Sequence, residues 1–196
     1  MTILAASAAL GLVSTSAAAQ APAASQPLGG PVIPGICLLS REAVFANGAI
    51  GKAATARLQE LARTAQAEID VERSPLEAEA KALQGQPDNA QSKSRRDALA
   101  ARWQALQVKV QHNNREIEAT RAKAMERIAA ETQPVVAQVY SQKKCGLVLD
   151  RGTVLGGNFA NDLTAEVVRG VDARIKTITF ERERLPMQSQ PGTAPG

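Results

Sequence analysis

The sequence predicts a mainly α-helical protein in which a long antiparallel helical hairpin projects as a coiled-coil arm from a small body with short β-strands. Apolar residues recur at steps of three and four over residues 52–83 and again over residues 91–144, which is the spacing of amphipathic helices. A turn rich in Gly, Pro and Asn at residues 85–89 separates the two runs. Aromatic residues make up only 3% of the chain, and this low fraction is typical of long helices rather than of a large compact core.

The first helix of the hairpin is expected over residues 52–83. Pro75 falls inside this segment and is expected to kink the helix, because proline removes one hydrogen bond and clashes with the preceding turn. At about 1.5 Å per residue, this helix would be about 48 Å long. The residues that mark its apolar stripe are Leu58, Leu61, Ala65, Ile69, Leu76 and Leu83.

The second helix is expected over residues 91–144, with a length of about 80 Å. Its apolar stripe advances by alternating steps of four and three, which is heptad spacing. Asn113 and Thr120 interrupt the stripe as polar residues that can fix the register of the two helices. Pro134 is expected to bend the helix near its base. The stripe consists of Leu99, Trp103, Leu106, Val110, Asn113, Ile117, Thr120, Ala124 and Ile128.

A small body is predicted from the two segments that flank the hairpin, residues 35–51 and 145–180. Short apolar runs at residues 35–40 and 146–150 predict β-strands. After a turn, residues 153–156 are expected to return as a third strand and to form a β-hairpin with the second.

Two short helices would complete the body. Residues 41–51 predict a short helix or turn that breaks at the Asn-Gly pair at residues 47–48. A closing helix is expected over residues 163–176, with Asn161 or Asp162 as its N-cap. Valine and isoleucine residues at helical spacing give this helix one apolar face.

The two ends of the chain differ from the rest in composition. Residues 1–19 contain an apolar run followed by an Ala-Ala-Ala site, which predicts a signal peptide for export, although a basic n-region is missing. An alanine-rich leader is the alternative interpretation. The apolar run is too short to span a bilayer. Residues 20–34 are expected to form a disordered linker and residues 181–196 a disordered tail, because both are rich in polar, Pro or Gly residues.

The chain contains two cysteines, Cys37 and Cys145, and each lies in or beside a predicted strand. An exported protein meets an oxidising compartment, so a disulfide between the two is one interpretation. It would close a loop of about 100 residues, for which the chain-entropy treatment gives at most about 4.7 kcal/mol. The alternative is two buried, unpaired thiols.

Charge is divided unevenly along the hairpin. Residues 41–90 carry 6 basic and 8 acidic side chains, whereas residues 91–144 carry 11 basic and 5 acidic ones, a net charge of +6. A basic helix attracts acidic clients, lipopolysaccharide or an anionic membrane surface. The alternative is an ordinary solvated face with intrahelical ion pairs such as Glu118–Arg121. The candidate binding residues are Lys93, Arg95, Arg96, Arg102 and Lys109.

Signatures of catalysis and of cofactor binding are absent from the sequence. His112 is the single histidine and lies in the middle of a predicted helix, where a solvated or seam residue is more typical than a base or ligand. Two cysteines and one histidine at these spacings do not make a zinc site. The glycines at residues 48 and 51 do not complete a phosphate-binding loop, because Ala46 and Ala53 occupy required positions. No enzymatic activity, metal or cofactor is therefore expected.

The order of these elements resembles the Skp/OmpH family of periplasmic chaperones over residues 35–176. The most specific part consists of Gly-Leu-Val-Leu-Asp at residues 146–150, Thr-Val-Leu at residues 153–155 and Asn-Asp-Leu-Thr-Ala-Glu-Val-Val at residues 161–168. The resemblance implies a homotrimer whose strands form a central β body and whose three hairpins surround a cavity. It also implies a periplasmic holdase that binds unfolded outer-membrane proteins in that cavity without ATP.

Two other classes of function fit parts of the sequence. A coiled-coil adaptor or spacer in the cell envelope would bind one folded partner instead of many unfolded ones. A nucleic-acid-binding protein would explain the sequence pI of about 9.3, but it conflicts with the export signal, so no nucleic acid is expected as a partner.

Overall fold

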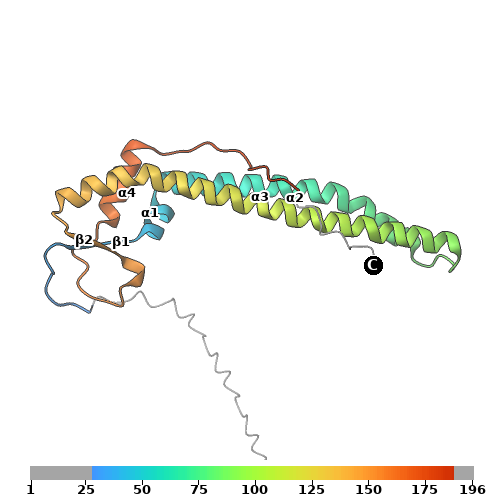
Figure 1. The fold of residues 1–196 in the computed structure, drawn as a ribbon, viewed down its shortest axis with the longest axis horizontal. Coiled ribbons are helices and arrows are strands. Elements are labelled where there is room, and N and C mark those ends of the chain that lie inside the picture. Colours follow the sequence, from blue (N-terminus) through green and yellow to red (C-terminus); the bar gives the residue numbers. More distant parts are fainter. Residues whose placement is uncertain (1–27, 188–196) are drawn as a thin grey trace, which may run out of the picture.

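The structure is a computed structural model that describes residues 28–187. The predicted signal peptide, residues 20–27 of the predicted linker and residues 188–196 of the predicted tail lie outside the described residues. A long helical arm extends from a small body at one end (Figure 1). The elements in chain order are β1 (Ile36–Leu39), α1 (Arg41–Asn47), α2 (Ala49–Leu83), α3 (Ala90–Gln142), β2 (Leu147–Asp150), the 3₁₀ turn η1 (Arg151–Thr153) and α4 (Thr164–Arg174).

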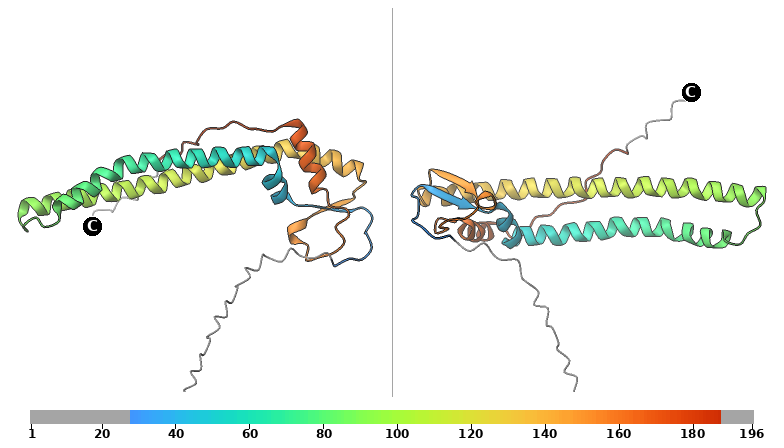
Figure 2. Two further views of the ribbon diagram at one scale, coloured as in Figure 1. Left: turned by 180° about the vertical axis from the view of Figure 1, so that it is seen from behind. Right: turned by 90° about the horizontal axis from the view of Figure 1, so that it is seen from below.

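The arm is the predicted antiparallel hairpin, formed by α2 with 35 residues and α3 with 53 residues. The two helices lie side by side along the whole arm (Figure 2). Their outer half is held together by the predicted apolar stripe, in which Trp103 and Val110 pack against the buried residues. Those buried residues are Ile69, Leu76, Leu83, Leu99 and Leu106.

Local signals set the ends of the two long helices. The side chain of Asn89 accepts a hydrogen bond from the Ser92 amide at 2.9 Å, and Ser92 Oγ accepts one from the Asn89 amide at 3.1 Å, so the pair forms a capping box at the start of α3. The first helix begins at Ala49, three residues before the predicted start. Pro75 and Pro134 lie inside α2 and α3, and both helices continue through them.

The body contains a two-stranded parallel sheet. Residues Ile36–Leu39 of β1 pair with residues Leu147–Asp150 of β2, because the chain leaves along α2, returns along α3 and re-enters the body in its original direction. On the other edge of β1, the Leu163 amide donates to the Leu38 carbonyl at 2.8 Å. This edge is therefore covered by the segment that leads into α4.

The third strand predicted at residues 153–156 does not form. The chain instead tightens into the 3₁₀ turn Arg151–Thr153 directly after β2. The Asp150 carboxylate accepts from the Gly152 amide at 2.8 Å, and the Thr153 hydroxyl donates to the Asp150 carbonyl at 2.8 Å. These two bonds favour a helical turn over the hairpin turn that a returning strand requires.

The closing helix α4 packs against the base of the hairpin and completes the core of the body. The N-cap of α4 is Leu163 and not the predicted Asn161 or Asp162, because the Leu163 carbonyl accepts the first helical bond from the Val167 amide at 2.9 Å. The Asp162 carboxylate lies just before the cap and accepts from the Thr164 amide at 2.8 Å. Asn161 has a different role, since its side-chain amide donates to the carbonyls of Ile33 and Ile36. The buried core joins the body to the hairpin and consists of Cys37, Leu39, Val44, Ile50, Ala54, Ala124, Ile128, Val135, Val139, Cys145, Leu163, Val167, Val171 and Ile178.

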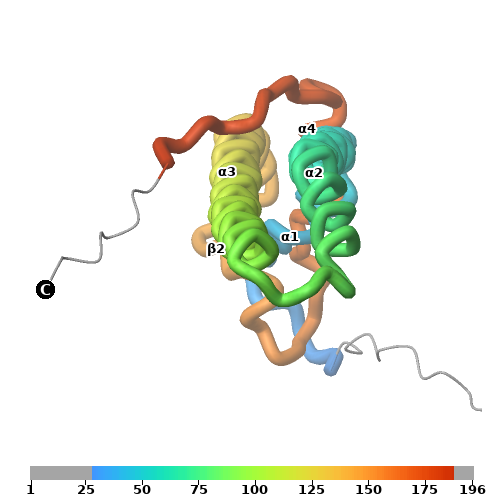
Figure 3. Tube along the Cα trace, turned by 90° about the vertical axis from the view of Figure 1, so that its right-hand side faces the viewer, coloured from blue at the N-terminus to red at the C-terminus, as the bar shows by residue number. Residues whose placement is uncertain are grey.

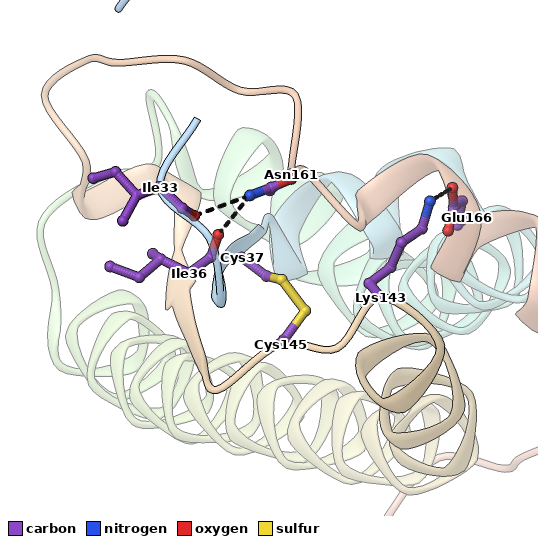
Figure 4. The surroundings of a disulfide bond; sticks show 7 residues. All are labelled: Ile33, Ile36, Cys37, Lys143, Cys145, Asn161 and Glu166. Carbon is purple, nitrogen blue, oxygen red and sulfur yellow. Dashed lines mark hydrogen bonds and ion pairs between the residues drawn. A yellow bond between two sulfur atoms is a disulfide. The ribbon is translucent and has the colours of Figure 1, made fainter. Parts of the chain in front are cut away.

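A disulfide between Cys37 and Cys145 closes the base of the hairpin (Figure 4). The two Cα atoms are 5.8 Å apart, within the usual range for a disulfide. Nearby, Lys143 at the end of α3 forms an ion pair with Glu166 of α4 (2.5 Å). The strand β1, the end of α3 and α4 are thus joined at one place by covalent and ionic contacts.

Residues 175–187 follow α4 and turn back along the arm as an extended segment, which we call the strap. Viewed from the tip of the arm, the strap crosses from the side of α2 to the side of α3 (Figure 3). The prediction of a disordered tail is wrong for residues 181–187, because Arg182 is buried and the amides of Glu183 and Leu185 donate to side chains of α3. Hydrogen bonds and ion pairs with the hairpin order this polar segment.

Candidate functional site

The basic residues singled out in the sequence all lie on the outer half of α3, and they are not gathered into one pocket. Three are engaged in ion pairs. Arg96 lies 2.9 Å from Asp88. Arg102 reaches Glu79 and Lys109 reaches Glu72, both across the hairpin on α2. These pairs are exposed, and exposed pairs contribute only about 0–1 kcal/mol each.

Lys93 and Arg95 remain exposed near the tip and form no ion pair with any residue of the described chain. The alternative pair Glu118–Arg121 is also not formed. The structure therefore leaves two of the five candidate cations available to an external anion, and these two are the nearest to the tip.

A second group of charges lies at mid-arm under the strap, and sequence reasoning missed it. We call it the Glu116 cluster: Glu116, His112, Glu68, Arg182 and Arg184. Glu116 is only 2% exposed and lies on the seam side of α3. Its carboxylate is 2.8 Å from Arg182 Nε, 3.3 Å from Arg184 Nη1 and 3.0 Å from His112 Nε2. Arg182 also donates to Glu68 of α2 at 2.9 Å.

The partners of Glu116 outweigh the effect of its burial. Burial alone raises the pKa of the Glu116 carboxyl, because it penalises the charged form. The hydrogen bond from the Leu185 amide and the charges of Arg182, His112 and Arg184 have the opposite effect and hold the pKa below its ordinary value. The carboxylate is therefore ionised at neutral pH, and most of the groups that stabilise it come from the strap.

Neutralising Glu116 should weaken the docking of the strap in a pH-dependent way. Because the pKa is lowered in the folded state, the carboxylate stabilises the fold above its ordinary pKa of about 4.5, and the contribution disappears as the pH falls through the folded pKa. Glu116→Gln should therefore cost about 1.5–3 kcal/mol at pH 7. Denaturant unfolding of both proteins at pH 7 and at pH 3 measures the difference, which should shrink in acid. A difference that is equal at both pH values would contradict this assignment.

His112 is a buried residue beside Glu116 rather than a solvated one. Its Nδ1 atom has no hydrogen-bond partner within residues 28–187. Asn113 is buried in the seam as well and donates to the Ala65 carbonyl at 3.2 Å, so it links α3 to α2 at a fixed register. Trp103 packs in the seam as the heptad pattern predicts.

The outward face of β2 is apolar, and we call it the apolar face of the body. Leu147 and Leu149 of β2 point away from the core, with 50% and 38% of their surface exposed, and Leu155 is 99% exposed. Val32 and Ile33 are also exposed large apolar residues of the body. Exposed large apolar side chains that share one face, as Leu147 and Leu149 do, are typical of an interaction site.

Two kinds of site are not found in the part of the chain that the structure describes. Residues 28–187 contain no group of three or more His, Cys, Asp or Glu side chains that could hold a metal ion. No helix in the same part combines the length and the apolar character that crossing a bilayer requires.

Comparison with known proteins identifies the family. Residues 35–171 match the family described as outer membrane protein (OmpH-like). A crystal structure of an OmpH-like protein from Caulobacter crescentus CB15, described as a candidate outer membrane chaperone, is similar with a TM-score of 0.71 and 40% sequence identity. The similarity covers 81% of this chain and 96% of the other. Among curated proteins, none matches the chain. The long hairpin, the small body and these matches together show that the chain belongs to the OmpH-like family.

Proposed function

We propose that this protein is an ATP-independent periplasmic holdase that binds unfolded outer-membrane proteins along its arm and prevents their aggregation. The observation that carries the proposal is the arm itself, in which an OmpH-like body supports helices of 35 and 53 residues with a large lateral surface. The structural relative is described as a candidate outer membrane chaperone. The Cys37–Cys145 disulfide favours an oxidising compartment such as the periplasm.

The composition of the arm suits weak and reversible binding. Alanine residues and long Lys, Arg and Gln side chains dominate α3. The aliphatic stems of such side chains can contact apolar client segments while their polar ends stay in water. Many weak contacts release a client without an energy source, and several arms acting together raise the total affinity.

The apolar face of the body supports assembly into a homotrimer. Leu147 and Leu149 lie on the outer face of β2 and would be buried by neighbouring copies. The double substitution Leu147→Glu and Leu149→Glu should dissociate the assembly, because each leucine contributes about 1.5–3 kcal/mol when buried. Sedimentation equilibrium measures the mass. Val71→Glu is the matched control, since Val71 is 75% exposed but lies on the arm. A double variant that keeps the wild-type trimer mass would contradict this assignment.

The unpaired cations near the tip support contact with an anionic membrane surface or with lipopolysaccharide. Lys93→Gln with Arg95→Gln should weaken binding to vesicles that contain anionic lipid by about 2 kcal/mol per chain, at about 1 kcal/mol for each basic residue near the surface. The matched control is Arg102→Gln with Lys109→Gln, which removes the same charge from residues already paired with α2. Vesicle co-sedimentation measures both variants. Equal losses of vesicle binding in the two double variants would show that binding depends on net charge alone and not on the unpaired cations near the tip.

The second candidate function is a coiled-coil adaptor or spacer that binds one folded partner, and the exposed apolar face of the body is the observation that favours it. Size-exclusion chromatography with one β-barrel protein in two forms separates the two functions. A holdase co-elutes with the barrel protein when the barrel protein is diluted from urea. It does not co-elute with the same barrel protein after that protein has folded in detergent. An adaptor that recognises folded surfaces would show the opposite preference.

A further inference from the structure

The strap binds the arm through carbonyl groups of its main chain. The Thr179 carbonyl accepts a hydrogen bond from Nη1 of Arg127 on α3 at 3.0 Å. The next carbonyl, that of Phe180, accepts from Nε of Arg57 on α2 at 3.1 Å. One arginine from each helix of the hairpin therefore binds one of two consecutive carbonyl groups of the strap.

Farther along the strap, amide groups of the main chain are bound in the same way. The Glu183 amide donates to Oγ1 of Thr120 at 2.9 Å, and the Leu185 amide donates to Oε1 of Glu116 at 3.0 Å. The two amides are two residues apart, which is the repeat of an extended strand. Hydrogen bonds to main-chain groups do not depend on the side chains of the bound segment, so other extended chains can form the same bonds.

The side chains of the strap alternate between the arm and solvent. Ile178 and Arg182 are buried and Phe180 is half-buried, whereas Thr179 and Glu181 between them are exposed. A pocket of about 450 Å³ opens beside Phe180, where α3 and the strap meet. Over residues 178–182 the surface of the arm therefore accommodates an extended segment in which every second side chain faces inward, and beyond Arg182 this alternation ends.

A cation of the strap is held at the centre of this surface. The Arg182 side chain is 6% exposed and lies 2.8 Å from Glu116 of α3 and 2.9 Å from Glu68 of α2. Without the strap, Glu116 would keep only His112 among the partners described here, and a buried carboxylate with few partners is costly. The arm thus carries two carboxylates, Glu68 and Glu116, that bind a cation from an extended segment.

We propose that this mid-arm surface is a binding site for an extended client segment with alternating apolar side chains and one basic residue, and that the strap is its resident occupant. The inference rests on the proposed holdase function. Strands of outer-membrane barrels alternate apolar and polar residues with the same two-residue period. A client strand can therefore form the main-chain bonds of the strap, place a basic side chain between Glu68 and Glu116, and displace the strap. Free arms stay covered until a client competes successfully with the tethered occupant.

The surface can be tested without a client by a labelled peptide. Arg182→Glu should release the strap, because a carboxylate would then face Glu68 and Glu116. A fluorescein-labelled peptide of residues 175–187, which keeps the arginine, should bind this variant at least tenfold more tightly than it binds the wild type. Arg169→Glu is the matched control, since it makes the same charge change on an exposed residue of α4, and it should bind the peptide as weakly as the wild type. Circular dichroism checks that both variants keep their helices.

Displacement by a client is tested on the unmodified full chain by hydrogen exchange. The amides of Glu183 and Leu185 should exchange slowly in the free protein and at least tenfold faster when an unfolded outer-membrane barrel is bound. Failure of the peptide to bind the Arg182→Glu variant would overturn the site. Unchanged protection of the strap beside a held client would overturn the displacement while leaving the holdase function intact. Light scattering on the same samples reports separately whether the client is held, and a client that is not held would defeat both proposals.

Discussion

Replacing Cys37 and Cys145 together with serine should lower the free energy of unfolding by up to about 4.7 kcal/mol, since the cross-link closes a loop of more than 100 residues. The two cysteines are 108 positions apart, and the loop between them contains the whole hairpin. In the unfolded chain the disulfide removes much of the freedom of this loop, so the variant should melt at a lower temperature. Client binding should remain largely intact, because the disulfide lies in the body and not on the arm.

Calorimetry under oxidising conditions measures this loss. Wild-type protein treated with a reducing agent provides the control, since it should melt near the double variant if the cross-link is responsible. Melting temperatures that stay the same in the oxidised wild type and the double variant would disprove the role assigned to the disulfide.

Gly51→Ala should destabilise the protein by about 3 kcal/mol, at the upper end of the usual cost of overpacking. Gly51 is buried in the first turn of α2, against the preceding helix α1. A Cβ atom there would lie 1.8 Å from the Phe45 carbonyl oxygen and 2.8 Å from the Phe45 carbonyl carbon. Because these atoms are main chain, α1 would have to move away from α2 to make room.

The sign of this effect is informative, because alanine in place of glycine inside a helix is otherwise stabilising by about 0.8–1 kcal/mol. Denaturant unfolding gives the difference in stability. Gly146→Ala is the matched control, since its Cβ would lie 3.6 Å from the Gly35 carbonyl oxygen, an ordinary contact. A stabilised Gly51→Ala variant would mean that α1 is not packed against α2 in this way.

The hairpin could be predicted from the sequence because the residue patterns that define its helices and its turn are local and periodic. The heptad steps between Leu99 and Ile128 define one face of α3, and the turn after Leu83 forces the two helices to be antiparallel. The break at Gly48 is also a local signal, and α1 ends there as predicted, whereas the N-cap of α4 is Leu163, one residue after the predicted Asp162.

The strap could not be predicted, because its order depends on partners that are distant in the sequence. Residues 181–184 alternate acidic and basic side chains, a pattern that is typical of a solvated segment. Arg182 is ordered by Glu116 and Glu68, which lie 66 and 114 positions earlier, and neither helix reveals in its sequence that a third segment lies over it. The missing third strand has a local cause, since the Asp150 side chain stabilises a 3₁₀ turn that propensity alone does not show.

The pairing of the basic candidate residues on α3 could not be predicted from the sequence either. The sequence shows that Arg102 and Lys109 are basic, but only the register of the hairpin shows that each faces a glutamate of α2. Lys93 and Arg95 lie near the start of α3, directly after the turn at the tip, and form no such pair with a described residue. The pairing of charges across a hairpin is therefore a tertiary property, and a helix-by-helix count of charge does not reveal it.

The holdase function is the central claim, and dilution of an unfolded client tests it most directly. A urea-unfolded outer-membrane β-barrel protein is diluted into buffer with the mature protein and without ATP, while light scattering and the stoichiometry of the complex are followed. The proposal predicts suppressed aggregation at about one client for each assembly of arms, because arms that act together would hold a single unfolded chain. Aggregation that proceeds as fast as in buffer alone would contradict the proposed function and would direct the search to a folded partner in the cell envelope.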